Sequence, residues 1–144
     1  MSGPLDELYQ EVILDHYKHP RCHGCLSAPQ AQSSLYNPLC GDHITIELTV
    51  ENGRVAQIAF SGKGCSISQA AASMMSSICE GQSIVEVEKF LNKFRALMRG
   101  EVGQSECAEL GDAVALEGVR KFSARVKCAM LAWEALERCL SEVQ

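Results

Sequence analysis

Residues 44–60 read ITIELTVENGRVAQIAF, a pattern that specifies a β-hairpin. From residue 44 to residue 51 aliphatic residues alternate with polar ones, which places one face of a strand in the core and the other in water. Asn52-Gly53 is the favoured pair for a two-residue type I′ turn. Since the alternation resumes at Ala56 and continues to Phe60, we expect two antiparallel strands joined at this turn.

Downstream of the hairpin, the hydrophobic period changes to that of helices. Residues 66–79 are rich in Ala and Ser, which suits close packing of a helix against a neighbour, and Glu80-Gly81 should end that helix. Ser83 should begin the next helix, because Glu86 follows it at capping-box spacing. The apolar stripe of this second helix consists of Val87, Phe90, Leu91, Phe94, Leu97 and Met98.

The last third of the chain should contain one loop and two more helices. We interpret residues 100–111 as an exposed, acidic loop that carries Cys107 as an exposed thiol. A short helix is expected over residues 112–120 and a final one over residues 126–143, with Trp133 in the core.

The N-terminal part should supply one helix and a long loop. Pro4, followed by acidic residues, is typical of a helix start, and this helix should end before Pro20. Residues 21–41 lose the helical period and collect Gly, Pro and Asn, so we expect mostly loop there. A strand over residues 32–36 is only weakly indicated.

Together these elements predict one α+β domain over residues 1–144, in which a small antiparallel sheet of about three strands carries helices on one face. The composition, 47% hydrophobic and 22% charged, suits a single globular domain of 144 residues. Thirteen Lys and Arg against eighteen Asp and Glu give a net charge of -5, which argues against nucleic acid as a partner. Since no stretch approaches the roughly 20 apolar residues of a membrane span, and residues 1–10 lack the pattern of an export signal, we expect a cytoplasmic protein with no membrane partner.

Three of the eight cysteines stand at junctions between the expected elements. Cys40 precedes the first hairpin strand, Cys65 follows the second, and Cys128 stands at the start of the last helix. Because a hairpin brings its open ends together, Cys40, Asp42 and Cys65 should be neighbours, and Cys128 needs only to dock beside them. A helix N-terminus should favour the thiolate form of Cys65 and Cys128. In a reducing compartment these positions suit metal or sulfur chemistry better than disulfides.

Several motifs, taken together, resemble the U-type iron–sulfur cluster assembly proteins, the family of IscU, SufU and NifU N-terminal-like domains. The motifs are Leu8-Tyr9, Asp15-His16-Tyr17-Lys18-His19-Pro20-Arg21, Asn37-Pro38-Leu39-Cys40-Gly41-Asp42, Gly62-Lys63-Gly64-Cys65-Ser66-Ile67-Ser68, Leu110-Gly111-Asp112 and Arg125-Val126-Lys127-Cys128. The resemblance covers nearly the whole chain. It implies that Cys40, Cys65 and Cys128, with help from Asp42, hold zinc or a cluster, and that sulfur arrives as a persulfide from a cysteine desulfurase.

Two departures from the IscU pattern favour the SufU branch of this family. Lys127 stands where IscU-like scaffolds have a histidine before the third cysteine, and residues 122–126 lack the proline pair that an Hsp70-type chaperone recognises. A protonated lysine has no lone pair for a metal, so Asp42 is left as the fourth ligand. Three thiolates and a carboxylate leave a charge of about -2 around zinc, so we expect Lys63, Arg125 and Lys127 to compensate it.

The resemblance therefore implies a zinc-bound sulfur acceptor, closer to a sulfurtransferase than to a conventional turnover enzyme. It would take persulfide sulfur from a SufS-like cysteine desulfurase and pass it to the downstream cluster assembly machinery. We expect Cys40 to be the acceptor, because it lies on a loop before Gly41, whereas Cys65 and Cys128 lie at helix starts.

Two other functions are compatible with the same residues. In the first, the protein is a scaffold on which a [2Fe-2S] cluster is built, with iron or the cluster on the ligands in place of zinc. In the second, the protein is a structural zinc domain, which we disfavour because such sites usually have four Cys or His ligands.

The remaining candidate residues are interpreted as structural. Cys22-His23-Gly24-Cys25 has the spacing of half a zinc knuckle, but no second pair follows it, so loop thiols are the simpler interpretation. Cys79 and Cys139 lie within helices and should be buried. The histidines that we expect at the surface or in packing, rather than as metal ligands, are His16, His19 and His43.

Overall fold

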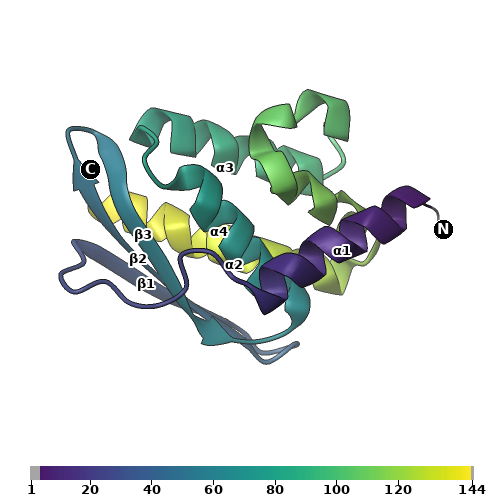
Figure 1. The fold of residues 1–144 in the computed structure, drawn as a ribbon, viewed down its shortest axis with the longest axis horizontal. Coiled ribbons are helices and arrows are strands. Elements are labelled where there is room, and N and C mark those ends of the chain that lie inside the picture. The colour runs from purple at the N-terminus through teal and green to yellow at the C-terminus, as the bar shows by residue number, and fades with distance from the viewer. Residues whose placement is uncertain (1–3, 144) are drawn as a thin grey trace.

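The expected hairpin forms two strands of the sheet in the computed structural model, which describes residues 4–143 (Figure 1). Strand β2 (Asp42–Glu51) pairs antiparallel with β3 (Arg54–Lys63). Both turn residues between them have positive φ angles, 53° at Asn52 and 74° at Gly53, as a type I′ turn requires. Strand β1 (Ala31–Asn37) pairs with the other edge of β2, so the strand order is β1-β2-β3. The weakly indicated strand is therefore confirmed.

A β-bulge interrupts the alternation in β3. Thr49 pairs with Gln57 but Val50 pairs with Val55, which leaves Ala56 as the extra residue. The bulge turns Val55 toward the core, where it is fully buried, while Ala56 is only partly buried. Our expectation that the alternation resumes at Ala56 was therefore wrong, because the bulge makes Val55 the buried residue at this point.

Helices cover one face of the sheet in two tiers (Figure 1). Helix α2 (Ser66–Cys79) and helix α4 (Ser123–Glu142) contact the strands directly. Helix α3 (Ile84–Met98) packs on α4, and helix α1 (Pro4–Lys18) packs on α2. The predicted α+β class, with a three-stranded antiparallel sheet, is confirmed. Within the described part of the chain, no helix has both the length and the apolar character needed to cross a membrane.

The core lies between the sheet and the helices. Ile44, Ile46 and Leu48 of β2 are fully buried, as their alternation predicted. Trp133 of α4 is fully buried too and stacks on Phe94 of α3, with ring centroids 4.9 Å apart. The whole predicted stripe of α3 is buried, and the hydroxyl of its N-cap residue, Ser83, accepts the backbone N–H of Glu86.

The segment between α3 and α4 differs from the exposed loop that we expected. It forms two 3₁₀ segments, η1 (Gln104–Glu106) and η2 (Ala108–Lys121), the second interrupted at Gly111. Cys107 and Leu110 are fully buried, because η2 folds against α3 and α2. The interpretation of Cys107 as an exposed thiol was therefore wrong, and burial raises the pKa of this thiol.

His16 joins three helical elements. Its side chain is almost fully buried, with Nδ1 2.7 Å from the Ser73 hydroxyl on α2 and Nε2 2.9 Å from the Asp112 carboxylate on η2. Both ring nitrogens are thus occupied by hydrogen-bond partners. The expectation that His16 is a packing residue is confirmed.

Candidate metal centre

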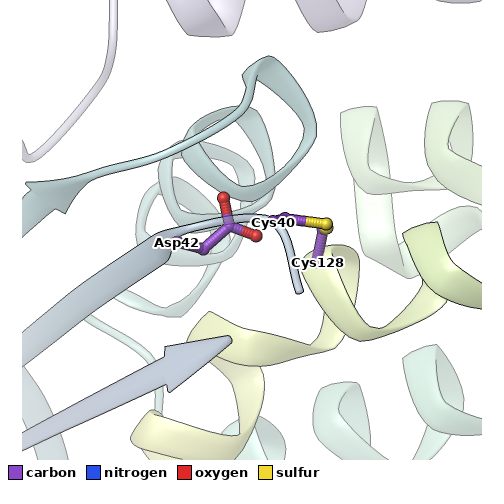
Figure 2. A group of neighbouring side chains, drawn as sticks. All are labelled: Cys40, Asp42 and Cys128. Atoms are coloured by element: carbon purple, nitrogen blue, oxygen red, sulfur yellow. The ribbon is translucent and has the colours of Figure 1, made fainter. Parts of the chain in front are cut away.

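Cys40, Asp42 and Cys128 come together at the open end of the hairpin (Figure 2). Cys40 lies in the turn between β1 and β2, Asp42 is the first residue of β2, and Cys128 lies on α4. One ligand atom from each of the three lies within 4.8 Å of the other two, and the two Sγ atoms are 3.0 Å apart. Asp42 and Cys128 are buried, whereas Cys40 is partly exposed.

The carboxylate of Asp42 is held in place by the start of α2. Its Oδ1 accepts the backbone N–H of Cys65 at 2.8 Å and the hydroxyl of Ser68 at 3.1 Å. Burial alone would raise the pKa of Asp42, but hydrogen bonds from the Cys65 N–H, the Cys128 thiol and the Ser68 hydroxyl outweigh it and lower the pKa. Asp42 therefore stays ionised, as a metal-binding carboxylate must.

Gly64 allows this close approach. A Cβ atom at this position would lie 2.3 Å from Oδ1 of Asp42, and its φ of +155° is one that L side chains rarely adopt. The Gly-x-Gly-Cys order in the sequence therefore has a steric reason at its second glycine, since only hydrogen fits between the backbone and Asp42.

Cys65 lies at the margin of the group. It is the N-cap residue of α2, as expected, and its Sγ is 3.9 Å from Oδ2 of Asp42. It is not one of the three residues whose ligand atoms all lie within 4.8 Å of one another. Its thiol nevertheless acts on Cys128, whose pKa it helps to raise. Of the four predicted ligands, the fold thus brings three together and places Cys65 beside Asp42.

Cys128 does not lie at the start of its helix. Helix α4 begins at Ser123, three residues before the expected start, so Cys128 lies in the second turn, with its Sγ 3.8 Å from the carbonyl oxygen of Ala124. Our expectation that a helix N-terminus favours its thiolate was therefore wrong. Burial, followed by the neighbouring Cys40 and Asp42, raises the pKa of the Cys128 thiol. A metal cation bound between these ligands would favour loss of the Cys128 thiol proton, because the thiolate is the form that binds metal.

The donor set fits a tetrahedral zinc ion, and Cys40, Asp42 and Cys128 are spaced for three of its corners, whereas Cys65 has to move closer to complete the fourth. With zinc–sulfur bonds of 2.3 Å, two ligand atoms of a tetrahedron lie about 3.8 Å apart. The Cys40–Cys128 separation of 3.0 Å and the Cys65–Asp42 separation of 3.9 Å are within about 1 Å of that value. Sulfur donors with one carboxylate oxygen suit zinc better than Mg²⁺ or Ca²⁺, which prefer oxygen alone.

Of the three expected cations, Arg125 alone interacts with the cysteines within residues 4–143. Its pKa is raised by a hydrogen bond with Cys128 and by the charges of Cys65 and Cys40. Lys63 at the end of β3 and Lys127 on α4 are exposed, and their side chains make no ion pair or hydrogen bond in the described chain. Positive charge therefore reaches the sulfurs from the solvent side, through Arg125.

Two polar residues of this site were not assigned from the sequence. Ser68 supports Asp42, and the amide of Asn37 donates to Cys128 Sγ at 3.5 Å. The role of Ser68 could have been inferred from the sequence, because Ser68 follows the N-cap residue Cys65 by three positions and so lies in the same first turn of the helix. The contact of Asn37 with α4 links residues 91 positions apart in sequence and has no local signal.

The other cysteines and histidines lie outside this group, as interpreted from the sequence. Within residues 4–143 no second set of three metal-binding side chains includes Cys22, Cys25 or the nearby His23. Cys22 is half-buried, and burial together with Glu80 raises its pKa to about 11, whereas Cys25 is exposed. The histidine and helical cysteines were placed correctly: His43 stacks on Tyr36, and Cys79 and Cys139 are fully buried.

Comparison with known proteins gives a consistent assignment. Residues 8–129 match the family model of the NifU-like N terminal domain. The chain is 42% identical over 137 residues to the zinc-dependent sulfurtransferase SufU of Bacillus subtilis (strain 168), covering 95% of this chain and 92% of that protein. It is 39% identical over 136 residues to the iron-sulfur cluster assembly scaffold protein IscU of Streptococcus pyogenes serotype M1, covering 94% of this chain and 84% of that protein.

The fold has close structural counterparts as well. A crystal structure from Fervidobacterium islandicum AW-1, described as a candidate iron-sulfur cluster assembly scaffold protein for the SUF system, superposes with a TM-score of 0.85. That chain is 28% identical, and the match covers 96% of this chain and 99% of that one. The resemblance drawn from the cysteine motifs is thereby confirmed, and the chain belongs to the family of NifU-like N-terminal domains.

Proposed function

We propose that this protein accepts persulfide sulfur from a cysteine desulfurase and passes it into iron–sulfur cluster assembly, with zinc held by Cys40, Asp42, Cys65 and Cys128 at rest. The observation that carries the proposal is the group of two sulfurs and a carboxylate within 4.8 Å of one another. The 42% identity to a zinc-dependent sulfurtransferase supports the same function.

The proposed ligands divide into fixed and movable ones. Zinc, when bound, supplies a positive charge that keeps the sulfurs as thiolates. Asp42 is fixed by the Cys65 N–H and by Ser68, and Cys128 is buried within a helix. Cys40 lies in a turn before Gly41, whose φ of +70° is a left-handed conformation, and it is the ligand with the freest backbone.

Cys40 is accordingly the proposed acceptor. Its thiolate attacks the outer sulfur of the persulfide on the partner, so that a new S–S bond forms to Cys40. The S–S bond of the partner breaks, its cysteine leaves as a thiolate, and the proton stays on the transferred sulfur. Arg125, exposed beside the sulfurs, supplies positive charge where these anions meet.

Similarity to SufU supports a SufS-like desulfurase as the donor and the downstream assembly machinery as the recipient. We also propose a cytoplasmic location, because a reducing compartment keeps such thiols free. Residues 1–144 are proposed to work as a single domain, because one continuous cluster of buried residues runs through the sheet and α2, α3 and α4.

The test is to incubate the zinc-loaded protein with a matched desulfurase and cysteine, trap persulfides by alkylation, and map the added sulfur by peptide mass spectrometry. We expect the sulfur on Cys40 and its loss in Cys40→Ala, while Cys25→Ala, which removes an exposed thiol outside the site, retains full uptake. Sulfur on Cys65 or Cys128, or full uptake by Cys40→Ala, would contradict the assignment.

A scaffold for a [2Fe-2S] cluster is the second candidate, favoured by the 39% identity to a protein named as a scaffold. Three cysteines can hold iron as well as zinc. Metal analysis after anaerobic purification separates the two functions. Colourless protein with about one zinc per chain supports sulfur transfer, whereas brown protein with iron and labile sulfide supports the scaffold.

A further inference from the structure

We propose that Asn37 is a positioning residue that holds the sulfur of Cys128 as a fixed ligand and so leaves Cys40 as the reactive one of two neighbouring sulfurs. The two Sγ atoms lie only 3.0 Å apart, so they would share one metal ion, although Cys128 is fully buried and Cys40 is partly exposed. This inference rests on the proposed function, because it explains how one of two similar ligands is selected as the acceptor.

The fold places Asn37 with little freedom. It is the last residue of β1 and pairs with Asp42, the first residue of β2, and the residue is 5% exposed. Its backbone carbonyl accepts the N–H of Cys40 at 3.2 Å, which closes the turn that carries this cysteine. Asn37 therefore touches both ligand-bearing segments, one through its backbone and the other through its side chain.

The orientation of the Asn37 amide follows from its partners. The backbone N–H of Leu39 points at Oδ1 from 3.3 Å, and only the oxygen of the amide can accept it. The NH₂ group is thereby turned to Cys128 Sγ, at 3.5 Å. Because the side chain is buried, water does not compete for this N–H donor.

The two sulfurs consequently differ in the hydrogen bonds that they accept. Cys128 Sγ accepts the Asn37 donor and is hydrogen-bonded to Arg125, whereas the hydrogen-bond contact of Cys40 Sγ among the described side chains is with the Cys128 thiol alone, which donates to it. A hydrogen bond to a ligand sulfur draws electron density from it and makes it less nucleophilic, while it fixes the ligand in place. Cys40 keeps its full nucleophilicity and the freer backbone.

Two substitutions separate this role from the simple burial of Cys128. Asn37→Asp keeps the side-chain shape and the acceptor for Leu39, but it replaces the N–H donor with a carboxylate oxygen and adds a negative charge. Asn37→Ser keeps a neutral acceptor for the same N–H, but it lacks the amide N–H, and its hydroxyl lies on a shorter side chain, farther from Cys128 Sγ. Asn92→Ser, the same chemical change at an exposed position on α3, is the matched control.

The readout is the site of alkylation in zinc-loaded protein under limiting iodoacetamide, mapped by peptide mass spectrometry. We expect wild type and Asn92→Ser to react at Cys40, and both Asn37 variants to show a Cys128 share raised about tenfold, with zinc affinity lowered about 10–100-fold in chelator competition. In cobalt-substituted protein, the sulfur-to-metal charge-transfer band should shift in the Asn37 variants alone, which a general loss of stability would not produce.

Each result bears on one of the two proposals. An unchanged Cys40 to Cys128 ratio with an unchanged cobalt spectrum in the Asn37 variants overturns the role of Asn37 and leaves burial as the explanation. Preferential reaction of Cys128 in the wild type overturns Cys40 as the acceptor instead, and so contradicts the proposed function. If Asn37→Ser does not fold, the Cys40 to Cys128 ratio of Asn37→Asp decides, since this variant preserves the turn and the packing and only its zinc affinity is also affected by the added charge.

Discussion

Replacing Gly64 by alanine should displace Asp42 and weaken the metal site. The added Cβ would lie 2.3 Å from Oδ1 of Asp42 and 2.7 Å from the hydroxyl of Ser68, distances that no relaxed structure tolerates. The carboxylate must move, and with it the hydrogen bonds from the Cys65 N–H and from Ser68. Gly64→Ala therefore disturbs the ligand Asp42 without replacing it.

The size of the effect can be set against a matched glycine. Gly24→Ala introduces the same side chain at a comparable φ, +140° against +155° at Gly64, but meets nothing within 4 Å. Both variants bear the backbone strain of about 1–3 kcal/mol. Gly64→Ala adds an overlap of about 1–3 kcal/mol and weakened hydrogen bonds to a charged group, worth about 1.5–3 kcal/mol. We expect a difference of about 2–4 kcal/mol between the two variants, since the overlap is relieved as the carboxylate moves.

Urea unfolding of the metal-free proteins measures the free energy of unfolding, and competition with a chromophoric chelator measures zinc affinity. Gly64→Ala should be the less stable variant and should bind zinc about 10–100-fold more weakly than wild type, whereas Gly24→Ala should bind zinc normally. Equal losses of stability in the two variants, together with unchanged zinc affinity in Gly64→Ala, would refute the steric argument and the role of Asp42 as a ligand.

Three further predictions concern metal, thiol reactivity and partners. Because the ligands come from three separate segments, zinc should stabilise the folded protein, by about 2.7 kcal/mol when free zinc is at 100 times its Kd. Removing zinc with a strong chelator should therefore lower the melting temperature, and an unchanged Tm in protein shown to be metal-free contradicts this. Cys22, with its pKa raised to about 11, should be alkylated more slowly than Cys25 at pH 8. The alkylation rate of Cys22 should rise about tenfold for each pH unit up to its pKa. Equal rates for the two cysteines in a timed mass-spectrometric assay argue against the burial of Cys22. The chain should not stimulate an Hsp70-type ATPase, because residues 122–126 lack a proline pair, and clear stimulation in a steady-state ATPase assay would favour the IscU branch.

Local pattern was sufficient for much of the fold. The β2–β3 hairpin follows from alternation and Asn52-Gly53, and the start of α3 follows from Ser83 and Glu86, because residues within a few positions of one another make these contacts. The proximity of Asp42 to Cys65 was also predictable, since the open end of a hairpin has to bring its flanking residues together.

Features set by distant contacts could not be obtained in this way. The burial of Cys107 depends on how η2 packs against α3 and α2, and the bulge at Ala56 depends on the pairing of two strands. The early start of α4 removes Cys128 from the helix end. No local pattern predicts such features, because their free energy comes from surfaces that meet only after folding.

The residue types of the metal ligands were therefore evident from the sequence, but the different environments of the individual ligands were not. Cysteines and an aspartate at element junctions indicate a metal site by their chemistry alone. That Asp42 is ionised, that Gly64 has to be glycine, and that Asn37 touches one sulfur and not the other are properties of the assembled site. Each depends on atoms of separate elements that folding brings within 4 Å of one another, where burial and hydrogen bonding, rather than residue type, set the chemistry of the ligands.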